Sequence, residues 1–189
     1  MHIKKIMSQE EKAKRDKIRS MVIGIALTAI LLFSTAGYAF FSGNTEKQQK
    51  IEYKGIKFVL GNDNLWHTTI QDYEFALSFN PKETENISGF LSLNIQNYIS
   101  QPLYFTYDSN KQAINEISSN IERFTSRIQY VCLDNCTEDF PIKNCSSNII
   151  SIKQENETLI KQEDSCVFIH YKDNAVRAAD AFIFKILGI

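Results

Sequence analysis

The sequence lacks the short motifs by which the common enzyme classes are recognised. It has no GxSxG nucleophile elbow, no HExxH zinc motif and no glycine-rich phosphate loop. Histidine is scarce as well, because only His2, His67 and His170 occur in the chain. Few side chains are therefore available for general acid–base work near neutral pH. These absences favour a binding module over an enzyme, and nothing in the sequence indicates a cofactor.

An excess of charge of one sign is also missing. The 189 residues carry 21 lysine and arginine side chains against 22 aspartate and glutamate side chains, for a formal net charge of −1. Domains that bind nucleic acid usually carry a basic excess, so we expect no nucleic acid among the partners. The chain has neither an internal repeat nor a low-complexity tract. Its length suits one domain with an N-terminal segment.

The near-neutral total hides two regions of opposite charge. Residues 1–20 hold seven basic and three acidic side chains, which gives +4, and the 14 basic and 19 acidic side chains after residue 41 give −5. Between these regions the segment Met21–Phe41 has no charged residue. A helix of that length covers about 31 Å, close to the thickness of the hydrocarbon core of a bilayer. A basic flank of this kind marks the cytoplasmic side.

These features predict a single-pass protein of the cell membrane that contacts the lipid bilayer through residues 21–41. Its N-terminus would lie in the cytoplasm and its C-terminal domain outside. The predicted organisation is a basic tail over 1–20, a transmembrane signal anchor over 21–41, a tether over 42–50 and an extracytoplasmic domain over 51–189. A cleaved signal peptide is the alternative, because a basic start followed by an apolar stretch and small residues also fits that description.

Hydrophobic periodicity predicts an α+β domain. Alternation over 51–81 indicates an antiparallel meander of three strands. An apolar stripe over 114–124 predicts a helix that begins at Ser109, and a second helix is expected over 173–188. The mostly antiparallel sheet, with both helices on one side, would be completed by strands at 89–95, 102–107, 127–132, 148–154 and 166–171.

Four segments carry a resemblance. They are YKGIKF at 53–58, FALSFNP at 75–81, PIKNC at 141–145 and AADAFIFKILGI at 178–189. Together with the basic tail and the apolar run, the chain resembles small uncharacterised membrane-anchored envelope proteins of archaeal genomes. The resemblance implies an envelope protein, and no activity comes with it.

The four cysteines are the strongest candidates for chemistry. Outside the cytoplasm an even number of cysteines in a small domain indicates disulfides. Three connectivities are possible, of which we favour Cys136 with Cys145 and Cys132 with Cys166. The alternative is a thiol-redox or copper site in which Cys132 and Cys136 are joined by His170, because copper(I) favours thiolates. Against it, the segment after Cys136 lacks the amphipathic helix that would lower the pKa of a thiol.

Four Asn-x-Ser/Thr sequons are possible glycosylation sites: Asn86, Asn135, Asn144 and Asn156. Two of them have cysteine in the middle position, where disulfide formation competes with modification. Taken together, the sequence predicts a disulfide-stabilised, non-enzymatic domain that binds an envelope protein or another surface partner. The second hypothesis is a tethered protein that handles thiols or copper.

Overall fold

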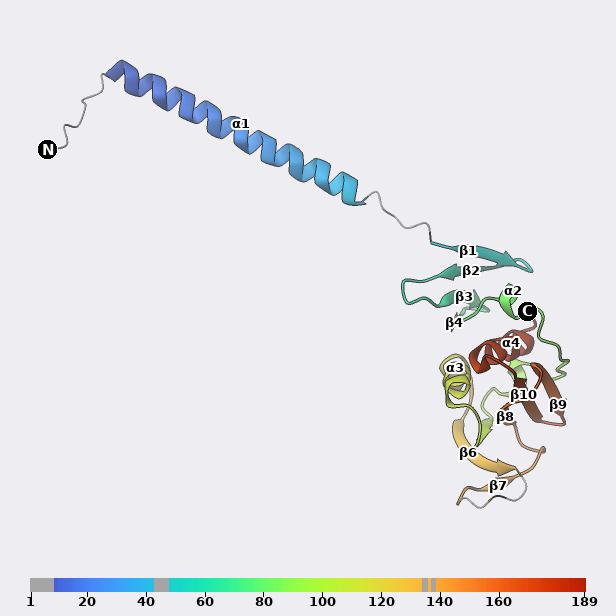
Figure 1. Ribbon diagram of the computed structural model, residues 1–189. Coiled ribbons are helices and arrows are strands. Elements are labelled where there is room, and N and C mark those ends of the chain that lie inside the picture. Colours follow the sequence, from blue (N-terminus) through green and yellow to red (C-terminus); the bar gives the residue numbers. More distant parts are fainter. Residues whose placement is uncertain (1–8, 43–47, 134–135, 137–138) are drawn as a thin grey trace. The chain divides into compact units, whose positions relative to one another are not determined.

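The computed structural model describes residues 9–42, 48–133, 136 and 139–189, and within the first helix it describes the side chains of residues 10–33 (Figure 1). The chain divides into two compact units, Met1–Lys47 and Gln48–Ile189.

The first unit contains one long helix, α1 (Gln9–Ser42). Within the described part of the chain, no helix is both long enough and apolar enough to cross a membrane. The predicted transmembrane anchor over 21–41 is therefore unsupported. The predicted cell-membrane location with the domain outside is wrong on this finding.

The second unit begins with a four-stranded antiparallel sheet. Its strands are β1 (Lys50–Tyr53), β2 (Ile56–Leu60), β3 (Trp66–Ile70) and β4 (Tyr73–Leu77), in the order β1-β2-β3-β4. The prediction of three strands is wrong by one. Lys54 and Gly55 have φ values of 49° and 80°, and two successive positive values form the tight type I′ turn that separates β1 from β2.

A six-stranded sheet follows, and it corrects the predicted topology. Its strands are β5 (Pro102–Thr106), β6 (Arg127–Leu133), β7 (Ile142–Lys143), β8 (Ile149–Gln154), β9 (Leu159–Glu163) and β10 (Cys166–Tyr171). The order is β7-β6-β5-β8-β10-β9, and every neighbouring pair is parallel except β10 with β9. The expected strand at 89–95 is absent from this region. The short 3₁₀ turn η1 (Ile95–Asn97) begins there instead.

The helices of this unit are α2 (Pro81–Thr84), α3 (Lys111–Ile121) and α4 (Ala175–Leu187), and the 3₁₀ turn η2 (Glu122–Phe124) extends α3. Both predicted helices are confirmed, but each begins two residues later than expected. Asn110 caps α3 by accepting hydrogen bonds from the backbone, and Asn174 does the same for α4. Gly188 ends α4 in the left-handed conformation, with φ of 76°.

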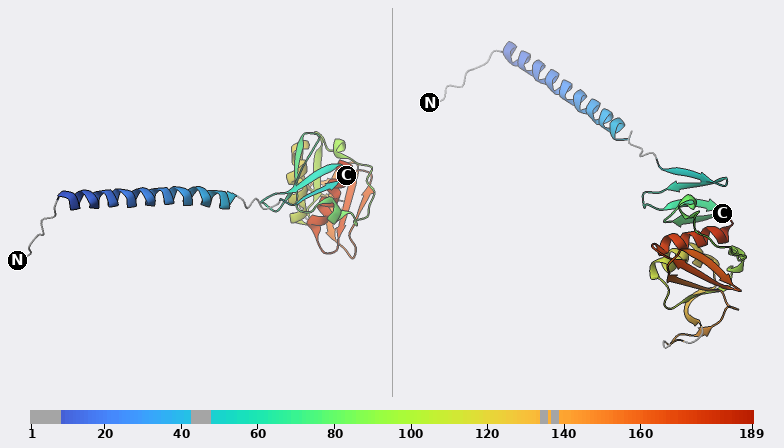
Figure 2. Two further views of the ribbon diagram at one scale, coloured as in Figure 1. Left: turned by 90° about the horizontal axis from the view of Figure 1, so that it is seen from above. Right: turned by 45° about the vertical axis from the view of Figure 1, so that its right-hand side comes forward.

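Helices α3 and α4 lie between the two sheets, so the unit has three layers (Figures 1 and 2). Phe58 of the small sheet packs edge-on against Phe184 of α4, with ring centroids 5.9 Å apart. Phe105 and Val167 of the large sheet belong to the same buried core. The α+β class is thus confirmed. The single, mostly antiparallel sheet with helices on one side is corrected to two sheets that share one helical layer.

Candidate functional site

The large sheet changes winding direction between β5 and β8. From β5 the chain passes through α3 to β6 on one side, whereas β8 lies on the other side of β5 and is followed by β10. In open parallel sheets, ligands bind outside the carboxyl ends of the strands at such a switch point. The carboxyl ends of β5, β8 and β10 are therefore the first place to look for a site.

A hollow of about 290 Å³ lies at this position. Strand β5 and the residues after it contribute Thr106 and Asp108, and strand β8 contributes Ser151 and Lys153. The remaining residues that matter for its chemistry are Cys136 and His170. Two residues that the sequence singled out for chemistry thus line the same hollow, although 34 positions separate them in the chain.

Buried hydroxyl groups form the inner wall of the hollow. The Oγ1 atom of Thr106 lies 2.7 Å from Oγ of Ser109 and donates to Oγ of Ser151 at 3.1 Å. Since Thr106 donates to Ser151, Ser109 must donate to Thr106. The backbone N–H of Ile152 donates to Ser109 Oγ at 3.0 Å, which anchors the cluster to β8. Ser151 accepts in this arrangement, and it is one of the residues that line the hollow.

An ion pair forms the outer wall. The Nζ atom of Lys153 lies 2.7 Å from Oδ2 of Asp108, and both side chains are between one third and one half exposed. Partial burial raises the pKa of Asp108, but hydrogen bonding and the charge of Lys153 outweigh it and leave this pKa below its ordinary value. Asp108 is therefore ionised at neutral pH, and the hollow presents one negative and one positive group.

His170 extends this polar wall along β10. It is half-buried and lies beside Lys153 in the parallel register of β10 and β8. Among the described residues, no three His, Cys, Asp or Glu side chains form a group that could hold a metal ion. The copper site predicted from Cys132, Cys136 and His170 is therefore not formed, although Cys136 and His170 share the hollow.

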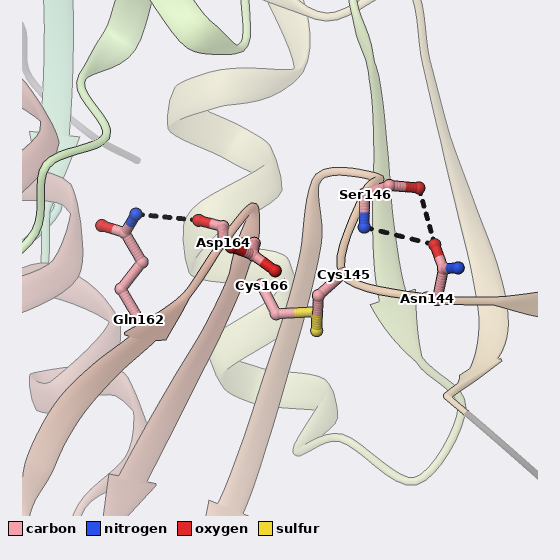
Figure 3. The surroundings of a disulfide bond; sticks show 6 residues. All are labelled: Asn144, Cys145, Ser146, Gln162, Asp164 and Cys166. Atoms are coloured by element: carbon pink, nitrogen blue, oxygen red, sulfur yellow. Dashed lines mark hydrogen bonds between the residues drawn. A yellow bond between two sulfur atoms is a disulfide. The ribbon is translucent and has the colours of Figure 1, made fainter.

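The cysteines form two disulfides, but with a pairing other than the expected one. Cys132 at the end of β6 pairs with Cys136. Cys145 pairs with Cys166 at the start of β10, and Figure 3 shows this second bond. Their Cα atoms lie 5.9 Å and 4.9 Å apart, within the usual range for disulfides. The backbone N–H of Ser165 donates to the carbonyl of Cys145 at 2.9 Å. This bond holds the segment after β7 against the turn before β10, so Cys145 meets Cys166 and not Cys136.

The predicted glycosylation sites that the structure describes do not line the hollow. Asn86, Asn144 and Asn156 are exposed, and Asn135 lies outside the described residues. Oδ1 of Asn144 accepts hydrogen bonds from the backbone N–H of Ser146 at 3.2 Å and from its hydroxyl at 2.6 Å (Figure 3). Asn86 accepts a hydrogen bond from Arg177. Their modification stays a prediction.

Sequence reasoning missed a buried carboxyl group between the layers. Asp180 of α4 is fully buried, and its Oδ2 accepts the backbone N–H of Phe79 at 2.7 Å. Burial raises the pKa of Asp180 to about 9, and the charge of Glu116 together with a hydrogen bond to it adds to the rise. Asp180 is therefore protonated at neutral pH. An aspartate beside alanines in a helix carries no signal that would separate it from a surface residue.

A second hollow, of about 590 Å³, lies on the outer face of the small sheet. Its polar side chains include Lys57, His67 and Glu74, all of which are exposed. His67 lies 2.9 Å from Asp63 and is held by it. This hollow has no set of buried hydrogen-bonding groups comparable with Thr106, Ser109 and Ser151, so the switch-point hollow is the better candidate site.

No protein-family model, curated protein or solved structure matches the chain. The comparisons thus supply neither a family nor an activity, and the resemblance to archaeal envelope proteins stays a prediction. The function has to be inferred from the geometry of the hollow.

Proposed function

We propose that the unit Gln48–Ile189 is a non-enzymatic binding module that takes a small polar ligand into the switch-point hollow. The observation that carries the proposal is the convergence of buried hydroxyls and an ion pair on one hollow at the carboxyl ends of parallel strands. Pockets for small molecules usually measure about 300 to 1,000 Å³, so a hollow of about 290 Å³ limits the ligand to the small end of that range.

The ion pair favours a ligand that carries both charges. A ligand with an anionic and a cationic group can replace the contact between Asp108 and Lys153 with two contacts of its own. A ligand with a single charge would leave one of these two side chains without its partner, at a cost in free energy. The hydroxyl of Ser151 would add a hydrogen bond to the anionic group. Amino acids and very short peptides have this chemistry.

Calorimetric titration of the full chain tests the proposal. The probes are zwitterionic amino acids, each compared with its N-acetyl and its amide derivative, which carry one charge. We expect binding of a zwitterion, and a loss of about tenfold or more in affinity when Lys153→Met removes one member of the ion pair. Lys161→Met is the matched control, because Lys161 is exposed on β9 and does not line the hollow.

Two results would overturn the proposal. One is the absence of binding for every zwitterion in the panel. The other is an equal loss of affinity in the Lys153→Met and Lys161→Met variants, which would place the binding site elsewhere. The hypothesis of thiol chemistry is favoured by a separate observation, the position of Cys136 in the wall of the hollow, and it leads to a more specific inference.

A further inference from the structure

We propose that the disulfide Cys132–Cys136 exchanges with a small thiol that binds in the switch-point hollow, and that Cys136 is the sulfur it attacks. The inference rests on the proposed function, because the hollow must hold the thiol. It narrows the ligand class to zwitterions that carry a thiol group. The bond Cys145–Cys166 takes no part in the exchange.

The two cysteines of the Cys132–Cys136 disulfide differ in how far a ligand in the hollow can reach them. Cys132 is fully buried at the end of β6, whereas Cys136 is half-buried and lines the hollow. Thiol–disulfide exchange requires that the attacking thiolate reach the sulfur in line with the bond that breaks. Only Cys136 is open to a ligand in the hollow, and Cys132 is therefore the leaving group.

The two disulfides differ in how tightly they are packed and in how much of the chain they join. Cys166 is 1% exposed and belongs to a small apolar cluster on the face of the large sheet that points away from the helices, against which Cys145 also packs. The Cys132–Cys136 bond joins residues four positions apart, and the Cys145–Cys166 bond joins residues 21 positions apart. Opening the first bond releases only a short loop. Opening the second would remove the covalent link between the segment that joins β7 to β8 and the start of β10.

The exchange balances without a further oxidant. The ligand thiolate attacks Sγ of Cys136, a new sulfur–sulfur bond forms between ligand and Cys136, and the bond to Cys132 breaks. The electron pair of that bond leaves on Sγ of Cys132, which takes a proton from water. A second thiol can then attack the ligand sulfur, which releases the oxidised ligand disulfide and leaves Cys132 and Cys136 reduced.

The charges that line the hollow suit this step. The ammonium group of Lys153 lies in the wall that also contains Cys136, and a nearby cation stabilises thiolates. His170 lies beside Lys153 and would add to this effect when it is protonated. The carboxylate of Asp108 opposes the stabilisation of a thiolate while it is paired with Lys153. When a zwitterionic ligand binds, its own charged groups replace that pairing.

The test treats the full chain with cysteine, quenches with acid, alkylates free thiols and maps each cysteine by mass spectrometry. We expect alkylated Cys132, a cysteine adduct on Cys136 and an intact Cys145–Cys166 bond, with the first disulfide opening about tenfold faster than the second. An equal rate for the two disulfides, or an adduct divided equally between Cys132 and Cys136, would overturn the inference.

Two variants test the asymmetry directly. In Cys132→Ser, the remaining Cys136 thiol should form a mixed disulfide with cystine, whereas Cys132 in the Cys136→Ser variant should react about tenfold more slowly because it is buried. Equal rates would count against the proposal. Circular dichroism checks that both variants are folded. The mass-spectrometric mapping of cysteines in the wild-type chain does not depend on these variants.

S-Methylcysteine separates this inference from the proposed function, because it has both charges but no free thiol. If it binds and cysteine at a saturating concentration leaves both disulfides intact, the exchange is refuted while the binding function stands. If S-methylcysteine fails to bind and no adduct forms, both are refuted. Binding of S-methylcysteine together with an adduct on Cys136 supports both.

Discussion

The two sheets of the Gln48–Ile189 unit are built by different means. In the small sheet every neighbouring pair is also consecutive in the sequence, so short turns determine which strands meet. In the large sheet only the pair β9 and β10 is a hairpin, and the parallel pairs are joined through helices or long connections. The small sheet gains its register locally. The large sheet brings together strands that are far apart in the sequence, such as β5 and β8, and the disulfide Cys145–Cys166 links the segment before β8 to the start of β10.

One edge of the small sheet is closed by a helix. Strand β4 is an edge strand, yet α3 supplies side chains to its free backbone groups. Asn120 accepts from the N–H of Ala76 at 3.0 Å and donates to its carbonyl at 2.9 Å. Glu116 accepts from the N–H of Ser78 at 2.9 Å. The helix thus takes the place of a fifth strand, which protects an edge that would otherwise be open to pairing.

The largest expected effect tests whether the two sheets unfold together. Phe105 lies in a central strand of the large sheet and Phe58 in the small sheet, and both are fully buried in one core. Substitution of either residue by alanine should lower the free energy of unfolding by about 3 to 5 kcal/mol. Because the core is continuous, denaturant unfolding followed by fluorescence and by circular dichroism should give one shared transition for each variant. Two separate transitions in Phe58→Ala would mean that the small sheet is an independent folding unit.

The next effect concerns the edge of β4. Asn120→Ala would leave the N–H and the carbonyl of Ala76 without partners, and the expected loss is about 2 kcal/mol in the free energy of unfolding. Asn115→Ala is the matched control on the same helix, because Asn115 is exposed. Its effect should stay within about 0.5 kcal/mol. Equal values from the two variants in urea titrations would show that the contact with α3 does not hold this edge.

A pH effect is expected where α4 meets the end of the small sheet. The pKa of Asp180 rises from 3.8 to about 9 on folding, so between these values the native state holds a proton that the unfolded chain has lost. Stability should therefore fall as the pH rises through this window, with a slope of up to about 1.4 kcal/mol per pH unit from this group. Asp180→Asn keeps the shape of the neutral acid and should flatten the slope between pH 5 and pH 8. An unchanged slope in urea titrations would place the titrating group elsewhere.

The parts of the fold that have a local residue pattern could be predicted from the sequence, and the order of the strands could not. Alternating residues in β3 and β4, and the apolar stripes of α3 and α4, report which side of an element is buried, and those elements were identified. Periodicity carries no information about which strands are neighbours. The parallel order of the large sheet was therefore out of reach, as was the pairing of Cys145 with Cys166.

The site was predictable only in part, for the same reason. Cys136 and His170 were selected by residue type alone, and the fold brings them to one hollow. Lys153 and Ser151 looked like ordinary members of a strand, since nothing local reveals that β8 lies beside β5 at a switch point. Nothing in the local sequence separates Asn120 from an ordinary polar residue of α3, because its partner, the backbone of Ala76, is 44 residues away.

The smallest effect tests whether turns alone determine register in the small sheet. Gln71 and Asp72 form the turn between β3 and β4 and have φ values of 49° and 67°, although neither residue favours positive φ as asparagine and glycine do. The double substitution Gln71→Asn with Asp72→Gly should raise the free energy of unfolding by about 0.5 to 1 kcal/mol. Gly55→Ala in the other tight turn should lower it by about 1 kcal/mol, because φ there is 80° and alanine is strained in that region. If thermal melts show no gain for the double variant while Asn120→Ala is strongly destabilised, the register of β4 depends on its contact with α3 and not on its turn.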